Sequence, residues 1–135
     1  MEQGAVGMRI LLIDNDAALR RITARVLVLA GHAVLTAADG AEGLRLWREQ
    51  GADLVITDIQ MPGMNGIEVI LQLRSLAPDL PIIAISGGDR SRELDLLGNA
   101  KVLGAVGQLG KPFSADELYA AVQVAMGKRG RSDSA

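Results

Sequence analysis

The chain has 135 residues, 49% of them apolar and 22% charged, and a formal net charge of −2. This length fits one domain with its own hydrophobic core. Acids and bases are interspersed, which argues against a basic nucleic-acid surface. There is no cysteine, so disulfides, zinc–thiolate sites and thiol catalysis are excluded. With only Trp47, Phe113 and Tyr119 aromatic, we expect no base-stacking platform.

The apolar runs are too short to cross a membrane, and the N-terminus lacks the basic-then-apolar pattern of a signal peptide. We therefore expect a cytoplasmic protein that does not bind membranes. A Ser-His-Asp triad would have to use His32, the single histidine. Because His32 follows Ala30-Gly31 at a predicted helix-to-strand turn, we interpret it as a solvated turn residue.

The hydrophobic pattern predicts short apolar strands that alternate with helices. The strands are expected over Met8–Ile13, Ala33–Ala37, Asp53–Thr57, Ile82–Ile85 and Ala105–Leu109. The helices are expected over Ala17–Ala30, Gly40–Gln50, Ile67–Ala77, Ser91–Leu103 and Ser114–Met126. We expect a loose tail over residues 1–7, one domain over residues 8–127, and a polar tail over residues 128–135, with Gly127 ending the last helix.

Three of these helices carry further signals. In the first, the apolar stripe is predicted from Leu19, Ile22, Val26 and Leu29, which recur at helical spacing, and Asp16 is placed to cap it. The fourth is weaker, because it contains Gly98 and Asn99. The last begins with a capping box, Ser114 with Glu117.

Alternating strands and helices predict an α/β fold: a parallel sheet with helices on both faces and right-handed crossovers. We expect a flavodoxin-like, doubly wound (βα)5 fold with strand order 2-1-3-4-5. Ligands bind such sheets at the carboxyl ends of the strands, beside the switch point between strands 1 and 3. The residues that follow the predicted strands are therefore the candidate site.

Polar residues follow the strands at this edge: Asp14, Asn15, Asp58, Ser86 and Lys111. Carboxylate and amide oxygens are ligands that suit Mg²⁺, and a cation relieves the repulsion between clustered acids. Lys111 can neutralise a carboxylate and hold phosphate oxygens, and Ser86 can donate to phosphate. A carboxylate that attacks phosphorus forms an aspartyl phosphate. The set therefore favours phosphoryl transfer to an aspartate.

Four segments carry a resemblance to a known family: Leu11-Leu12-Ile13-Asp14-Asn15, Thr57-Asp58-Ile59-Gln60-Met61-Pro62-Gly63-Met64-Asn65-Gly66, Ala84-Ile85-Ser86-Gly87 and Lys111-Pro112-Phe113. In order and spacing the chain resembles the receiver domain of bacterial two-component response regulators, stand-alone and similar to chemotaxis regulators. The resemblance covers residues 8 to 127. The run Asp-x-x-Met-Pro-x-Met-x-Gly is its most specific part.

The resemblance implies a phosphoacceptor module. Asp58 would accept a phosphoryl group from a sensor histidine kinase, a phosphotransfer protein or a small phosphodonor. Asp14 and the backbone carbonyl of Gln60 would hold Mg²⁺, Ser86 would take a phosphate oxygen, and Lys111 would pair with the phosphoryl group. The peptide before Pro112 would be cis. Catalysis would be limited to self-phosphorylation and autodephosphorylation.

Output would then go to a downstream protein through the face of the fourth helix, fifth strand and fifth helix. A homodimer would use the same face, and no direct contact with nucleic acid is expected. Two positions depart from the family. Asn15 replaces a metal-binding acid, which predicts weaker Mg²⁺ binding, and Gln108 replaces the aromatic residue that normally rotates as Ser86 shifts.

Three alternatives remain open. The first is a pseudo-receiver, a protein-binding module that is not phosphorylated, which Asn15 and Gln108 would support. The second is a magnesium phosphohydrolase, which generally needs a second acid two residues after the nucleophile, where this chain has Gln60. The third is a flavin site, but Asp14, Asn15 and Asp16 would repel its phosphate.

Overall fold

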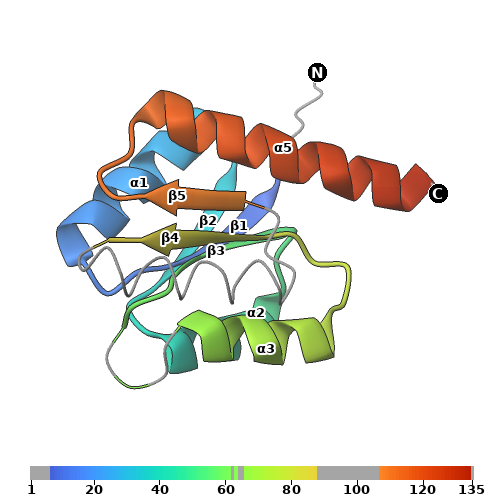
Figure 1. The fold of residues 1–135 in the computed structure, drawn as a ribbon, viewed down its shortest axis with the longest axis horizontal. Helices are drawn as coiled ribbons and strands as arrows, with labels where there is room; N and C mark the ends of the chain where they lie inside the picture. The colour runs from blue at the N-terminus through green and yellow to red at the C-terminus, as the bar shows by residue number, and fades with distance from the viewer. Residues whose placement is uncertain (1–6, 62, 64–65, 88–106, 135) are drawn as a thin grey trace.

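The computed structural model describes residues 7–61, 63, 66–87 and 107–134. Within them the chain forms a five-stranded parallel sheet with the order β2-β1-β3-β4-β5, as predicted (Figure 1). The strands are β1 (Arg9–Ile13), β2 (Ala33–Ala37), β3 (Leu54–Asp58), β4 (Ile82–Ser86) and β5 (Gly107–Gly110). The helices are α1 (Ala17–Leu29), α2 (Gly40–Gln50), α3 (Gly66–Leu76) and α5 (Ala115–Ser134).

The helix predicted over residues 91–103, and the first two residues of the predicted fifth strand, lie outside the described residues. The other boundaries agree with the predictions to within two residues, except at the end of α5. In the part of the chain that the structure describes, no helix combines the length and apolarity needed to cross a membrane.

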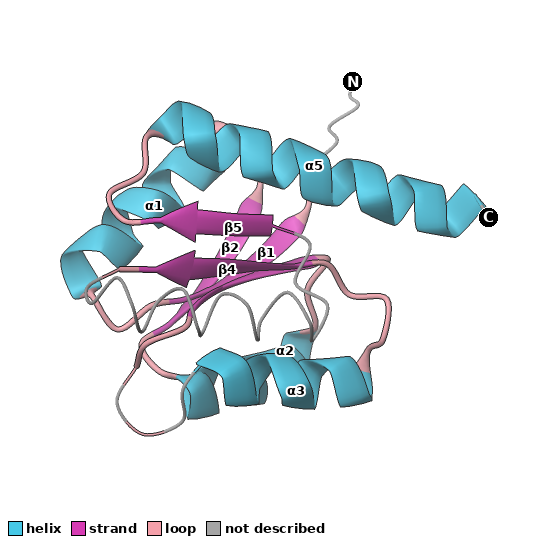
Figure 2. Cartoon of the chain, in the orientation of Figure 1, coloured by secondary structure: helices cyan, strands magenta, loops and turns pink. Residues whose placement is uncertain are grey.

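Helices cover both faces of the sheet, α2 and α3 on one side and α1 and α5 on the other (Figure 2). Successive strand residues point to opposite faces. Leu11 and Ile13 of β1 therefore enter the core beneath α2 and α3, whereas Ile10 and Leu12 enter the core beneath α1 and α5. This double burial explains why β1, β3 and β4 are nearly continuous apolar runs without polar alternation.

The helix starts follow the predicted capping chemistry. Asp16 accepts a hydrogen bond from the Leu19 N–H at 3.1 Å and so caps α1. Ser114 and Glu117 form the reciprocal capping box of α5, with bonds of 2.9 and 3.1 Å. The Asp16 carboxylate therefore serves as the helix cap that the sequence predicts.

The predicted apolar stripe of α1 is wrong at Ile22 and Leu29, whereas Leu19 is partly buried and Val26 packs against the core. Ile22 is 62% exposed and Leu29 is 75% exposed, whereas Thr23 and Leu27 are buried. Apolar residues occur on several sides of this helix, so their spacing does not decide which side faces the sheet. Leu27 packs into the core beneath α1 and α5, and that contact sets the orientation of the helix.

The predicted end of the last helix at Gly127 is also wrong, since α5 continues to Ser134 and extends beyond the sheet (Figure 1). A glycine inside a helix costs about 1 kcal/mol but ends it only in the left-handed conformation. Among the described glycines that conformation occurs at Gly31, Gly51 and Gly63. Gly31 and Gly51 lie at the C-terminal ends of α1 and α2.

Candidate functional site

The strand register brings the predicted site residues to one edge of the sheet. Ile13 of β1 pairs with Thr57 of β3, so the residues that come next in each segment, Asp14 and Asp58, lie side by side at this edge. Ser86 pairs with Gly110, which places Lys111 beside it, and the Lys111 N–H donates to the Ser86 carbonyl at 2.7 Å. Asp14, Asp58 and Ser86 are at most 3% exposed. The structure therefore brings two carboxylates, a hydroxyl and an ammonium together.

Lys111 joins the two carboxylates. Its Nζ lies 3.0 Å from Asp58 Oδ2 and 3.3 Å from Asp14 Oδ1. Burial alone would lower the pKa of Lys111, but its hydrogen bond to Asp58 and the charges of Asp58 and Asp14 outweigh burial and raise that pKa. Lys111 is therefore a firmly charged ammonium at neutral pH.

The surroundings of the Asp58 carboxyl disfavour its ionised form. Burial raises its pKa, and the charge of Asp14 raises it further. Lys111 and the Gln60 N–H, which donates to Asp58 Oδ1 at 3.2 Å, oppose that rise. One ammonium thus serves two buried carboxylates, so the site carries an excess of negative charge that a bound cation would relieve.

Asp14 offers a free ligand atom. Its Oδ1 accepts from the Asp16 N–H at 2.9 Å as well as from Lys111, whereas its buried Oδ2 has no partner. A buried carboxylate oxygen without a partner is costly and fits a site for a cation or its water. Asn15, the next residue, is exposed. In the described residues no three His, Cys, Asp or Glu side chains gather to hold a metal, so any metal there would keep several waters, as Mg²⁺ does.

Two glycines give the site its shape. A Cβ on Gly66 would lie 2.2 Å from the Asp58 carbonyl oxygen, so only glycine lets α3 begin against the end of β3. A Cβ on Gly87 would lie 2.9 Å from Lys111 Cδ, so the lysine stem lies across that glycine. Gly87 is therefore a surface on which the Lys111 side chain packs.

Sequence reasoning missed one contact at this edge. Arg20, at the end of the first turn of α1, donates from Nη1 to the backbone carbonyl of Asp14 at 2.7 Å. A cation six residues after an acid at a strand end is a weak signal, because an arginine on a helix usually points into solvent. Only the path of the chain through the β1–α1 turn shows that the guanidinium folds back onto that acid.

The remaining predicted positions are also placed. The Lys111–Pro112 peptide is cis, in agreement with the resemblance. Gln108 is exposed on β5, the last strand of the described sheet. His32 lies before β2, at the opposite edge from the site, where it is partly buried and its Nδ1 accepts from the Met8 N–H at 3.1 Å. The interpretation of His32 as a solvated residue is therefore wrong, although its place in a turn is confirmed.

Comparison with known proteins agrees with this geometry. Residues 10–123 match the family described as the response regulator receiver domain. The transcriptional regulatory protein PrrA of Mycobacterium tuberculosis is 36% identical over 130 residues, which cover 96% of this chain and 54% of PrrA. The response regulator MprA of Mycobacterium sp. strain KMS is 40% identical over 113 residues, 84% of this chain and 48% of MprA. The chain thus spans about half the length of these curated relatives.

The solved structures to which this chain is similar are also receiver domains. A response regulator receiver domain protein from Clostridium thermocellum has a TM-score of 0.84 at 31% identity, covering 90% of this chain and 96% of that one. A CheY-like receiver domain protein from Methanospirillum hungatei has a TM-score of 0.86 at 25% identity, covering 93% and 98%. With the family match and the gathered acids and lysine, these similarities show that the chain belongs to the response regulator receiver domains, the phosphoacceptor modules of two-component systems.

Proposed function

We propose that Asp58 is the residue that accepts the phosphoryl group. The observation that carries this assignment is the Asp58 carboxylate at the end of β3, 3.0 Å from the Lys111 ammonium and beside the unpartnered Asp14 Oδ2. Asp14 lacks this role in the proposal because its free oxygen, Oδ2, is assigned to the metal ion. Asp58 is bound to Lys111 and lies at the carboxyl end of β3, beside the switch point between β1 and β3.

The proposed step forms a bond between an Asp58 carboxylate oxygen and phosphorus and breaks the bond from phosphorus to the donor. The donor is a phosphohistidine of a sensor kinase or phosphotransfer protein, or a small acyl phosphate. The leaving atom keeps the bonding electron pair: a histidine nitrogen then takes a proton from solvent, whereas an acyl phosphate leaves as an ionised carboxylate. Lys111 then moves its hydrogen bond to a phosphoryl oxygen, and Ser86 donates to another.

Receiver domains generally use Mg²⁺ for phosphorylation, and the donor atoms here fit that ion. We propose that Asp14, Asp58 and the backbone carbonyl of Gln60 hold it, with the Asn15 amide at the rim. When bound, the ion supplies positive charge that compensates the two carboxylates and the transferring phosphoryl group. Asn15 supplies no charge, so we propose weaker Mg²⁺ binding than an aspartate at that position would give.

Receiver domains interact with histidine kinases and with downstream effectors. We propose that this chain signals to a protein partner through a face that includes β5 and α5, by a shift in a two-state equilibrium. We also propose a cytoplasmic location and no direct contact of these residues with nucleic acid. Of the longer relatives, PrrA is named as a transcriptional regulatory protein and MprA as a response regulator, and this chain matches about half of each.

The test is incubation of the full chain with acetyl phosphate and Mg²⁺, followed by intact mass. We expect one phosphoryl adduct on the wild-type chain. The adduct should be absent in Asp58→Asn, and absent in the wild type when a chelator removes Mg²⁺. Asp39→Asn is the matched control, because Asp39 follows β2 at the same edge and caps α2, and asparagine also caps. If the wild type forms no adduct at any Mg²⁺ concentration, the pseudo-receiver alternative takes its place.

A further inference from the structure

We propose that Arg20 is a positioning residue of the phosphorylation site, which fixes the β1–α1 turn so that Asp14 and Asn15 face the metal. The inference rests on the proposed metal site. The observation that supports it is the hydrogen bond that Arg20 Nη1 donates to the Asp14 backbone carbonyl, at 2.7 Å.

The Asp14 carbonyl needs a partner that the sheet does not supply. The ladders of β1 with β2 and β3 end at Ile13. Asp14 is 1% exposed, and its N–H still donates to the Ala37 carbonyl at 3.1 Å. Its carbonyl lies beyond the last ladder pair, and a buried carbonyl without a donor is rare and costly. Arg20, one turn past the Asp16 cap and partly buried, supplies that donor.

The bond from Arg20 completes the restraint of Asp14. The backbone N–H, the backbone carbonyl and Oδ1 of Asp14 all have partners, and Oδ2 alone is left. The peptide plane that Arg20 holds also joins Asp14 to Asn15. Fixing this plane restricts the backbone torsions on either side of it, and so the directions in which the Asp14 and Asn15 side chains leave the backbone. The free Asp14 oxygen, Oδ2, is then held in one position.

Positioning matters here because the excess of negative charge that attracts a cation to the site is small. Its two buried carboxylates share Lys111, and Asn15 is neutral. Arg20 itself adds a positive charge, which taken alone would weaken Mg²⁺ binding. Its contact with the Asp14 carbonyl outweighs this effect of its charge. These two effects of removing Arg20 have opposite signs, so an affinity measurement separates them.

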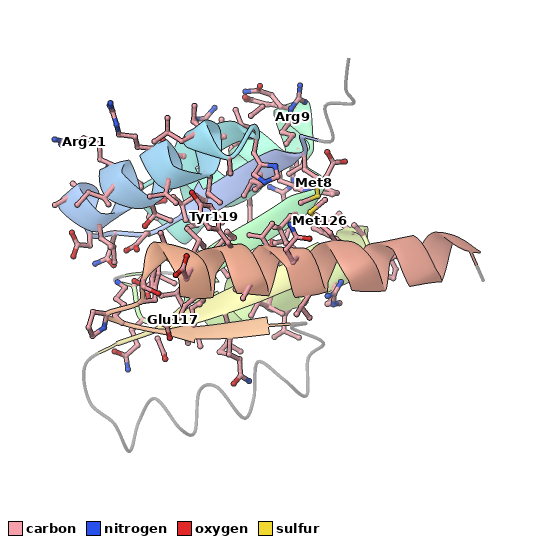
Figure 3. All side chains as sticks on the ribbon, turned by 90° about the horizontal axis from the view of Figure 1, so that it is seen from above. Met8, Arg9, Arg21, Glu117, Tyr119 and Met126 are labelled. Carbon is pink, nitrogen blue, oxygen red and sulfur yellow. The ribbon has the colours of Figure 1, made fainter. Side chains whose placement is uncertain are left out.

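The chain contains a matched control at the next position. Arg21 is exposed on the same helix, and Figure 3 shows its side chain directed away from the sheet. Arg20→Met and Arg21→Met remove the same charge one residue apart, but only the first removes the donor to Asp14. Arg20→Lys keeps the charge and a donor on a shorter stem. Asp14→Asn serves as the reference for a damaged metal site.

The experiment is calorimetric titration of chelator-treated full chain with MgCl₂. We expect Arg20→Met to weaken Mg²⁺ binding by about tenfold or more relative to Arg21→Met, the size typical for partners that orient metal ligands. Arg20→Lys should recover part of the loss. The Mg²⁺ concentration for half-maximal phosphorylation by acetyl phosphate should rise by the same factor, and the rate at saturating Mg²⁺ should recover.

Equal Mg²⁺ affinities of Arg20→Met and Arg21→Met would overturn the inference, as would tighter binding by Arg20→Met. A lowered melting temperature of Arg20→Met with unchanged affinity would likewise overturn it, because that is a structural role only. If Arg20→Met does not fold, Arg20→Gln against Arg21→Gln carries the same comparison. If the wild type binds no Mg²⁺, the proposed metal site fails and this inference fails with it.

Discussion

Replacing Lys111 with methionine keeps a stem of similar length but removes the only ammonium that contacts Asp14 and Asp58 among the described residues. At 3.0–3.3 Å each contact has a Coulomb energy of about 5 kcal/mol at an effective dielectric of 20, much of which desolvation offsets. Loss of one partner of a buried ion pair costs about 3–5 kcal/mol. Because the lysine side chain is 22% exposed, we expect about 3 kcal/mol in Mg²⁺-free buffer.

Urea unfolding in the presence of a chelator measures this loss. The same substitution in an Asp58→Asn background should cost roughly half as much, because one of the two buried charges is then absent. Saturating Mg²⁺ should shrink the deficit, since a cation replaces the lost ammonium. An equal cost in both backgrounds, or a loss within about 0.5 kcal/mol as for an ordinary surface change, would refute the assigned role of Lys111.

Three further predictions follow from single contacts. Gly87→Ala places a Cβ 2.9 Å from Lys111 Cδ, so phosphorylation by acetyl phosphate should slow severalfold, whereas Gly110→Ala, with nothing within 4 Å, should leave the rate unchanged. Asn15→Asp should tighten Mg²⁺ binding in calorimetry, and equal affinities would contradict the assigned effect of Asn15. Burial lowers the pKa of His32 from 6.5, so the unfolded chain binds its proton more readily. Stability should therefore fall as pH drops below about 6.5, and urea midpoints should show a smaller fall in His32→Asn.

The fold could be predicted because the signals for it are local and repeated. Strands buried on both faces read as uninterrupted apolar runs, and helices between them force parallel pairing. Asp14, Asp58 and Ser86 lie at or directly after the ends of such strands, and Lys111 follows the shorter and more exposed β5, so their meeting follows from topology alone. A residue that ends a strand is thus easier to place than one whose role depends on the direction of its side chain.

The features that were missed depend on direction and distance. The buried side of α1 is chosen by the packing of Leu27, which helical spacing cannot distinguish from the exposed Leu29. Gly127 ends no helix because its backbone is not left-handed, which the residue type permits but does not require. Arg20 folds back onto a carbonyl, and no side-chain pattern records which backbone groups a sheet leaves unpaired.

The assignment of Asp58 as the phosphoacceptor is tested most directly by locating the modification. The wild-type chain is incubated with acetyl phosphate and Mg²⁺, treated with borohydride, which reduces an aspartyl phosphate to homoserine, and sequenced by mass spectrometry. Homoserine at position 58, and aspartate unchanged at positions 14 and 16, is the predicted result. Homoserine at position 14, or at no aspartate while an adduct is present on the intact chain, would contradict the assignment.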